Sequence, residues 1–225
     1  MKQIFDFLKE LDANNNREWF QDNKNKYLEA KALFEEFVGE LIKGISRFDP
    51  EISGVAVKDC VFRIYRDLRF SPDKRPYKLY MGAYMCKGGK SSPYGGYYVH
   101  MQPGESFFAG GVYDGDPKLI KAVRKEIYGT IEEFKAIVEE PEFTRYYSLF
   151  GEKLKKVPAD FPSDFPDGEW LKYKHYSPAS FVDEGFFEGS DVVERCVKRL
   201  ELLLPINRYL NYTVDEWKEV TGKIK

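Results

Sequence analysis

The amino-acid sequence predicts an α+β fold, with an antiparallel sheet of about four to six strands covered by helices. Helical periodicity dominates residues 1–50, strand-like patterns occupy residues 51–113, and helices with long loops return over residues 114–225. A chain of 225 residues is long enough to bury a sizeable core. We therefore expect a single domain over residues 1–225, in which a long N-terminal helix and C-terminal helices pack on the sheet.

The N-terminal helix is predicted from an apolar stripe that follows a polar stretch. Asn15 and Glu18 have the spacing of a capping box, in which the Asn15 side chain caps the helix. Apolar residues then recur at helical spacing, namely Phe20, Tyr27, Phe34, Phe37, Val38, Leu41 and Ile45. Asp49 and Pro50 follow this stripe, and we expect the helix to end there.

Four segments read as strands: residues 60–66, 80–86, 97–101 and 106–112. In the first, apolar and polar residues alternate as they do in a half-buried strand. The last two are joined through Pro103 and Gly104, the residues that a type II turn prefers at its centre. A meander of antiparallel strands is the simplest interpretation. Gly110 and the glycine after it are expected at a bulge or at a close approach of another backbone or a ligand.

The remainder of the chain is predicted to return to helices. Asp116 before a proline, and Thr130 at the start of a capping box, mark two helix starts. Residues 170–176 resemble an edge strand because lysines suit an exposed edge. A last long helix is expected over residues 191–204, where Pro205 would stop it.

Composition excludes several classes of protein. The N-terminal residues lack the apolar core of a signal peptide, and no apolar run approaches the roughly 18 residues of a membrane span, so no membrane association is expected. Cys60, Cys86 and Cys196 are widely spaced and odd in number, which suits free thiols in the cytoplasm. With no CxxC pair and two histidines, no metal site and no cofactor are expected.

The net charge of −2 hides a local asymmetry. Residues 58–78 hold seven basic and three acidic residues, a net charge of +4. The rest of the chain has 28 basic and 34 acidic residues, a net charge of −6. The sequence therefore argues against broad adhesion to polyanions, while a local site for an anion is expected within the basic segment.

The basic segment contains one residue in an awkward place. An uninterrupted strand from residue 60 puts Arg66 on the same face as the apolar Ile64. Burying an unpaired guanidinium is costly, so either the strand bulges there or Arg66 pairs with a carboxylate such as Asp67 or Asp73.

The first functional hypothesis is an enzyme or a ligand-binding protein for an anionic small molecule bearing phosphate or carboxylate. The candidate ligand-binding residues are basic: Arg63, Arg66, Arg69, Lys74, Lys78, Lys172 and Lys174. The candidate catalytic residues are Asp67, Asp73, Tyr77 and His100. The two aspartates would orient the cations, and Tyr77 or His100 would transfer a proton.

Two alternatives stay open. The same segment suits an interaction module that docks an acidic protein segment or single-stranded nucleic acid, whose bases would stack on Tyr65, Phe70, Tyr77 and Tyr80. It also suits a purely structural network, if internal carboxylates saturate every arginine. A deep pocket around the segment would favour the small-molecule hypothesis, and a flat exposed surface would favour the interaction module.

The pattern RxYRDxRFSxDKxPYK at residues 63–78 resembles the central motif of a bacterial and fungal family of conserved hypothetical proteins, a domain of unknown function. The resemblance extends over most of the chain and includes residues 16–20 and 96–100. It departs from the family pattern over residues 159–165, where Phe165 replaces an expected histidine, so no histidine acts in that loop. The resemblance implies where the site lies. It implies no activity, because the family has no agreed one.

Overall fold

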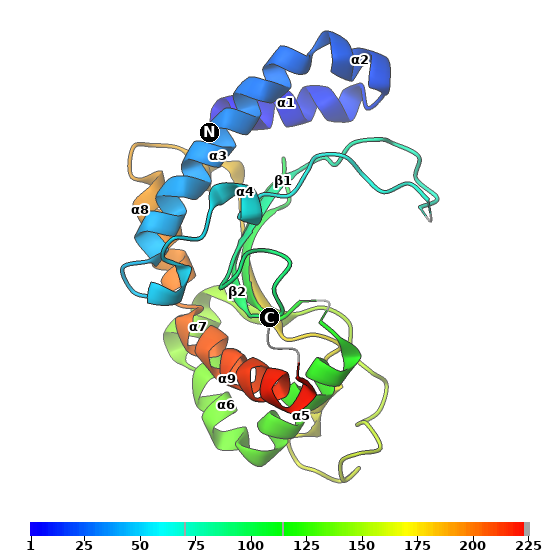
Figure 1. The fold of residues 1–225 in the computed structure, drawn as a ribbon, viewed down its shortest axis with the longest axis vertical. Coiled ribbons are helices and arrows are strands. Elements are labelled where there is room, and N and C mark those ends of the chain that lie inside the picture. Colours follow the sequence, from blue (N-terminus) through cyan, green and yellow to red (C-terminus); the bar gives the residue numbers. More distant parts are fainter. Residues whose placement is uncertain (70, 114, 223–225) are drawn as a thin grey trace. The chain divides into compact units, whose positions relative to one another are not determined.

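A computed structural model describes residues 1–69, 71–113 and 115–222 of the chain (Figure 1). These residues group into two compact units. Unit 1 contains Met1–Ser91, Tyr98–Phe108 and Phe181–Glu201. Unit 2 contains Ser92–Tyr97, Ala109–Ser180 and the residues from Leu202 onward.

The described residues form one five-stranded sheet with the order β1-β2-β3-β5-β4, which confirms the predicted α+β class. The strands are β1 (Met81–Met85), β2 (Gly96–Met101), β3 (Ser106–Gly111), β4 (Ser148–Phe150) and β5 (Ser177–Val182). The β4–β5 pair is antiparallel, with Ser148 opposite Ala179. Three of the four predicted strands, those in residues 80–112, lie where the sequence placed them. At the β2–β3 turn, Gly104 has a φ of 76°, as a type II turn requires.

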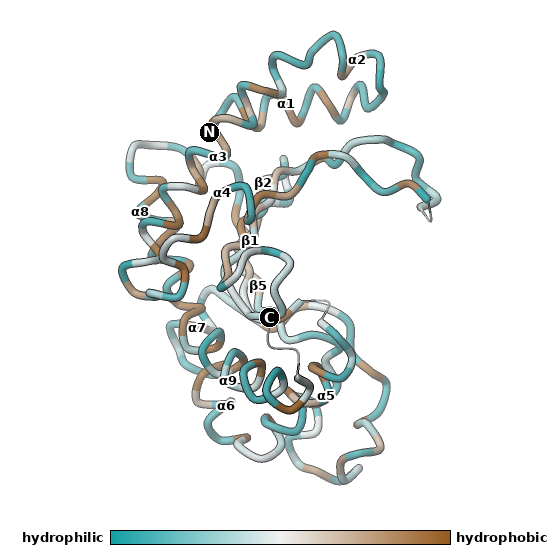
Figure 2. Tube along the Cα trace, viewed as in Figure 1, coloured by the Kyte–Doolittle hydropathy of each residue, from teal (hydrophilic) through white to brown (hydrophobic). Residues whose placement is uncertain are grey.

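Unit 1 contains the N-terminal helices. They are α1 (Lys2–Ala13), α2 (Arg17–Asp22), α3 (Lys24–Ile45), α4 (Val57–Cys60) and α8 (Val192–Glu201), with 3-10 helices at Pro50–Ile52 and Glu184–Phe187. Helix α3 packs along α8 and on β1. Figure 2 shows hydrophobic residues recurring along α3 between hydrophilic ones, in agreement with the predicted stripe. Gly44 lets the two helices approach closely, because a Cβ there would overlap Val197.

The predicted N-terminal helix differs from the structure in two ways. The helix is interrupted at Asn23, so the apolar stripe is divided between α2 and α3. The cap of α2 is Asn16, whose side chain accepts a hydrogen bond from the amide of Trp19 at 2.9 Å. The prediction that Asn15 caps the helix is therefore wrong, and Asn15 is left available for another contact.

Unit 2 is built from α5 (Pro117–Gly129), α6 (Ile131–Val138), α7 (Pro141–Tyr146), a 3-10 helix at Gly168–Lys172 and α9 (Leu204–Thr221). Helices α5 and α6 both pack on α9. The Asn207 side chain of α9 accepts from the amide of Gly111 at 2.8 Å and donates to the carbonyl of Gly96 at 3.0 Å. These bonds satisfy backbone groups that would otherwise be buried without partners.

Three predictions for unit 2 have definite outcomes. The starts of α5 and α6 are confirmed, although the Thr130 hydroxyl donates back to the Glu126 carbonyl and caps nothing. The predicted edge strand over residues 170–176 is wrong, because the 3-10 helix occupies residues 170–172 and only isolated bridges form after it, at Tyr173 and Tyr176. Pro205 does not end a helix but lies in the first turn of α9, where the missing amide proton costs no hydrogen bond.

The close approach predicted at the paired glycines is confirmed at Gly111. Its φ is 75°, and a Cβ atom there would overlap the carbonyl oxygen of Tyr176. The amide of Val112 also donates to this oxygen at 2.9 Å. Only glycine allows the backbone to come this close.

Candidate functional site

The basic segment forms an extended arm, defined here as residues 61–80, that leads into β1 (Figure 1). Its two legs pair in antiparallel fashion: the amide of Lys78 donates to the Ile64 carbonyl at 2.8 Å, and the amide of Arg66 donates to the Pro76 carbonyl at 3.0 Å. The predicted strand over residues 60–66 is thus an irregular leg of this arm. Phe70, a predicted stacking residue, lies outside the described residues.

The arm is fastened to the N-terminal helices at Tyr77. The side chain of Asn15 donates to the Tyr77 carbonyl at 3.0 Å and accepts from the Tyr77 amide at 3.1 Å. The Tyr77 ring is 3% exposed and stacks on Phe20, with ring centroids 3.9 Å apart. Burial raises the pKa of the Tyr77 phenol. The structure therefore places this predicted proton-transfer residue in the core, where it anchors the arm.

Ion pairs within the arm occupy most of its charged side chains. Asp73 accepts from Arg66 at 2.7 Å and from Arg75 at 3.0 Å. Asp67 pairs with Arg69 at 2.5 Å, and Lys74 donates to the Leu68 carbonyl at 3.3 Å. The prediction that Arg66 pairs with a carboxylate is confirmed.

These pairs also change the titration of both aspartates. Hydrogen bonds from Arg75 hold the pKa of Asp73 below its ordinary value, and those from Arg69 do the same for Asp67. Both carboxylates therefore stay ionised at neutral pH. Since both already accept hydrogen bonds from arginines of the arm, their contacts there stabilise its loop.

Arg63 and Lys78 differ from the other cations of the arm. Within the described part of the chain, neither forms an ion pair or a side-chain hydrogen bond. The Lys78 ammonium is half-buried and lies over two rings, 5.4 Å from the centroid of Phe62 and 5.5 Å from that of Tyr80. Burial and, secondarily, the charge of Arg63 lower the pKa of Lys78. The two cations therefore repel each other. Neither has a carboxylate at ion-pair distance among the described residues, although Asp67 lies near enough for the charge of Arg63 to lower its pKa.

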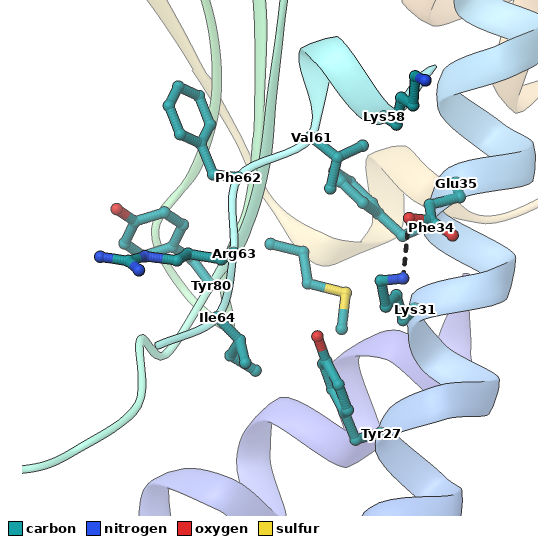
Figure 3. A pocket seen from close by; sticks show the side chains of 11 residues that line it. Tyr27, Lys31, Phe34, Glu35, Lys58, Val61, Phe62, Arg63, Ile64 and Tyr80 are labelled. Carbon is teal, nitrogen blue, oxygen red and sulfur yellow. Dashed lines mark ion pairs between the residues drawn. The ribbon is translucent and has the colours of Figure 1, made fainter. Parts of the chain in front are cut away.

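The rings beside Lys78 belong to a larger cluster, which we call the aromatic face. It consists of Phe62, Tyr80, Tyr98, His100, Phe107 and Phe181, all in unit 1. The chain segments that supply these rings are the arm, β2, β3 and β5. In Figure 3, the side chains of Phe62, Arg63 and Tyr80 point away from α3, so the aromatic face lies on the side of β1 opposite that helix.

His100 lies at the centre of the aromatic face. Its ring stacks between Tyr80 and Phe107, with centroids 4.2 and 4.5 Å away. The Nδ1 atom is 2.8 Å from the Tyr98 hydroxyl, and Nε2 is 3.1 Å from Oε1 of Gln102. Because this carbonyl oxygen only accepts, Nε2 carries the proton and Nδ1 accepts from Tyr98.

The environment of His100 keeps its imidazole neutral. Burial lowers its pKa to about 4, and the nearby charge of Lys78 acts in the same direction, against the hydrogen bond to Gln102. Only 8% of the His100 surface is exposed, so its ring has little contact with solvent. Its Nδ1 atom instead orients the Tyr98 hydroxyl. Gly82 makes room for this arrangement, because a Cβ there would lie 2.6 Å from the Tyr98 hydroxyl oxygen.

The other two predicted cations belong to unit 2. Lys172 pairs with Glu169, and Lys174 pairs with Glu152 at 2.5 Å. Each lysine therefore has a carboxylate partner within its own unit. The structure brings Arg63, Lys78 and His100 together in unit 1. Of the remaining predicted cations, Lys74 donates to a backbone carbonyl, and the others are held in internal ion pairs, namely Arg66, Arg69, Lys172 and Lys174.

Sequence reasoning missed Phe62, Tyr98, Phe107 and Phe181 as site residues. The signal for Tyr98 was present, because it shares strand parity with His100. Phe62 was expected on the core side with Ile64, but the leg is irregular and Phe62 points the other way (Figure 3). Phe107 of β3 and Phe181 of β5 join the aromatic face because of the order of the strands in the sheet, which local sequence patterns do not show.

A pocket of about 270 Å³ lies between α3 and the first leg of the arm (Figure 3). Val61 and Ile64 point toward α3, whereas Phe62 and Arg63 line the pocket from the leg and their side chains extend away from α3. Lys31 and Glu35 of α3 form an ion pair at 3.1 Å beside the pocket. The Arg63 side chain thus extends to the other side of the leg, and the Lys78 ammonium lies there over the rings of Phe62 and Tyr80.

Other kinds of site find no support in the described ranges. No three His, Cys, Asp or Glu side chains there group closely enough to hold a metal ion. No helix in that part of the chain is both long and apolar enough to span a membrane. All three cysteines are buried free thiols, and burial raises their pKa values, so none is an activated nucleophile.

These features define an α+β protein with a sheet face that combines aromatic rings and two cations without direct ion pairs among the described residues. A family described as conserved hypothetical protein (DUF2461) matches residues 3–209, and the chain belongs to this family. The resemblance to a family of conserved hypothetical proteins is thereby confirmed. No curated protein and no solved structure matches the chain.

Proposed function

We propose that the protein binds an anionic small molecule, bearing a phosphate or a carboxylate, between Arg63 and Lys78. The observation that carries this proposal is that neither cation forms a direct ion pair within the described residues, although the other arginines of the arm do; Asp67 acts on Arg63 only at longer range and is itself paired with Arg69. A bound anion would relieve the repulsion between Arg63 and Lys78. It would also compensate the half-buried ammonium, whose burial lowers its pKa.

The paired residues have a supporting part in this proposal. Arg66 and Asp73 hold the loop of the arm, and Asn15 fastens the second leg at Tyr77, one residue before Lys78. The backbone at Lys78 is therefore held by two contacts. The Lys78 amide donates to the Ile64 carbonyl of the first leg, and the amide of the preceding residue donates to the Asn15 side chain. A lysine whose backbone is already fixed loses less conformational freedom when it binds an anion.

The rings next to Lys78 add a preference for ligands that carry a planar group. Phe62 and Tyr80 flank the ammonium, and Phe62 is 37% exposed. A ligand with a phosphate on Lys78 can place an aromatic ring against Phe62. Nucleoside monophosphates combine both features, and they are the first compounds to test.

Titration calorimetry with nucleoside monophosphates and the corresponding nucleosides tests the proposal. We expect the monophosphate to bind, the nucleoside to bind at least about tenfold more weakly, and Lys78→Gln to lose a similar factor. Lys198→Gln is the matched control, because Lys198 is an exposed lysine of α8 that pairs with Glu194. Equal affinities for monophosphate and nucleoside, or equal losses in the two variants, would refute the proposal.

We also place the protein in the cytoplasm. The support is that all three cysteines are reduced and buried in the structure. A reducing compartment keeps such thiols free.

A further inference from the structure

We infer that the natural anionic ligand of the aromatic face is single-stranded nucleic acid, with bases stacked on the rings and phosphates on Arg63 and Lys78. This inference rests on the anion site of the proposed function, and it names the natural ligand as a polymer whose nucleotide units each carry the phosphate and the planar group proposed there. It comes from the extent of the ring cluster, which is larger than one small molecule would use.

The rings form a continuous row from the arm to β5. The ring centroids of Phe62 and Tyr98 are 6.2 Å apart, those of Tyr98 and Phe107 are 5.6 Å apart, and those of Phe107 and Phe181 are 5.4 Å apart. A mononucleotide with its phosphate on Lys78 reaches the Phe62 end of this row. The Phe181 end is three rings further on and would contact another base of the same strand.

The far end of the row is open to a ligand. Phe181 is 60% exposed, although it lies on a strand of the sheet, where an aromatic side chain would ordinarily be buried. Exposed aromatic rings on a sheet suit base stacking, which tolerates every base because each has a π face. In a duplex these faces are covered by neighbouring base pairs, so the row selects single strands.

The charge of the arm complements a polyanion. The segment over residues 58–78 has a net charge of +4 on a chain of −2, so attraction is confined to this region. Lys74, further along the arm, donates to the Leu68 carbonyl, and within the described ranges it forms no ion pair with a carboxylate. Phosphates on either side of the one held by Lys78 would meet this positive field.

An acidic protein segment is the other polyanion that would suit the same charge. Its carboxylates would pair with Arg63 and Lys78, but Asp and Glu side chains offer no aromatic ring that could stack on the ring row. Phe181 would then contribute nothing to binding. The ring row therefore separates the two ligand classes experimentally.

Fluorescence anisotropy with a labelled single strand of about ten nucleotides tests the inference, with a duplex of the same sequence, polyglutamate and a nucleoside monophosphate as competitors. We expect the single strand to bind at least about tenfold more tightly than the monophosphate and the duplex. Phe181→Ala should weaken the single strand by about fivefold or more, and by a larger factor than the monophosphate.

Phe150→Ala is the matched control, because Phe150 is a comparably exposed phenylalanine, at 51%, on β4 of unit 2. Circular dichroism establishes that both variants are folded. A single strand that binds no better than the monophosphate would overturn this inference and leave the proposed function standing. If neither binds, both fail. Competition by polyglutamate equal to that by the single strand, with no effect of Phe181→Ala, would overturn the inference in favour of an acidic protein segment.

Discussion

The side chain of Asn15 satisfies both backbone polar groups of Tyr77, donating to its carbonyl at 3.0 Å and accepting from its amide at 3.1 Å. These are the two hydrogen bonds that a neighbouring strand would form with Tyr77, so one side-chain amide takes the place of a strand at this residue. The residue after Tyr77 is Lys78, so the contact also sets the position of the unpaired ammonium. The N-terminal helices therefore act on the candidate site through one side chain.

Replacing Asn15 with alanine should release the second leg of the arm. Two partly buried backbone groups lose their partners, so the free energy of unfolding should fall by about 1–3 kcal/mol. Urea denaturation measures this change, and hydrogen exchange should show faster exchange of the Tyr77 amide. Asn16→Ala is the control: it removes the cap of α2 and costs about 0.5–2 kcal/mol, but it leaves the Tyr77 amide protected. Unchanged exchange at Tyr77 in Asn15→Ala would contradict the anchoring role.

Replacing Asp73 with asparagine should destabilise the protein in a pH-dependent way. The pKa of Asp73 in the folded protein lies below its ordinary value of 3.8, because Arg75 and Arg66 donate to it. Its contribution to stability is therefore complete above about pH 4 and is lost as the pH falls through the folded-state value.

Urea denaturation at several pH values measures this effect. The stability difference between wild type and Asp73→Asn should be largest near neutral pH and shrink below pH 3.8. Asp164→Asn, in an exposed loop of unit 2, makes the same chemical change without the arginine partners and serves as the control. A pH-independent difference for Asp73→Asn would show that its ion pairs do not stabilise the arm.

His100 should make the protein less stable at mildly acidic pH. Its pKa is about 4 when folded and 6.5 ordinarily, so the unfolded chain takes up a proton first as the pH falls. Its contribution to stability is complete above pH 6.5 and declines toward pH 4, by at most about 1.4 kcal/mol per pH unit.

Two measurements check this prediction. The chain has two histidines, so the nuclear magnetic resonance signal that disappears in His100→Gln identifies the imidazole of His100. That signal should titrate near pH 4, and the stability of His100→Gln should change less between pH 6.5 and pH 4 than that of wild type. Titration of His100 near its ordinary value would show that solvent reaches the ring and that the aromatic face is open around it.

Much of the fold was accessible from local patterns. The Pro103–Gly104 turn and the strands on either side of it follow from backbone preferences of single residues, and so does the start of α5 at Asp116. The errors arose where a tertiary contact competed with a local preference. Asn15 had the spacing of a cap, yet its hydrogen-bonding capacity is used by Tyr77, 62 residues away in the chain.

The sequence by itself determined the α+β class, the place of the positive segment at residues 58–78, and the need of Arg66 for a carboxylate. Only the tertiary structure decided which cations stay unpaired. Arg63 and Lys78 stand on separate legs of the arm, and pairing of the legs brings them close enough for the charge of Arg63 to lower the pKa of Lys78. The physical reason is that charge and periodicity are properties of neighbouring residues. Compensation of a charge, by contrast, depends on which distant groups the folded backbone brings within hydrogen-bonding distance.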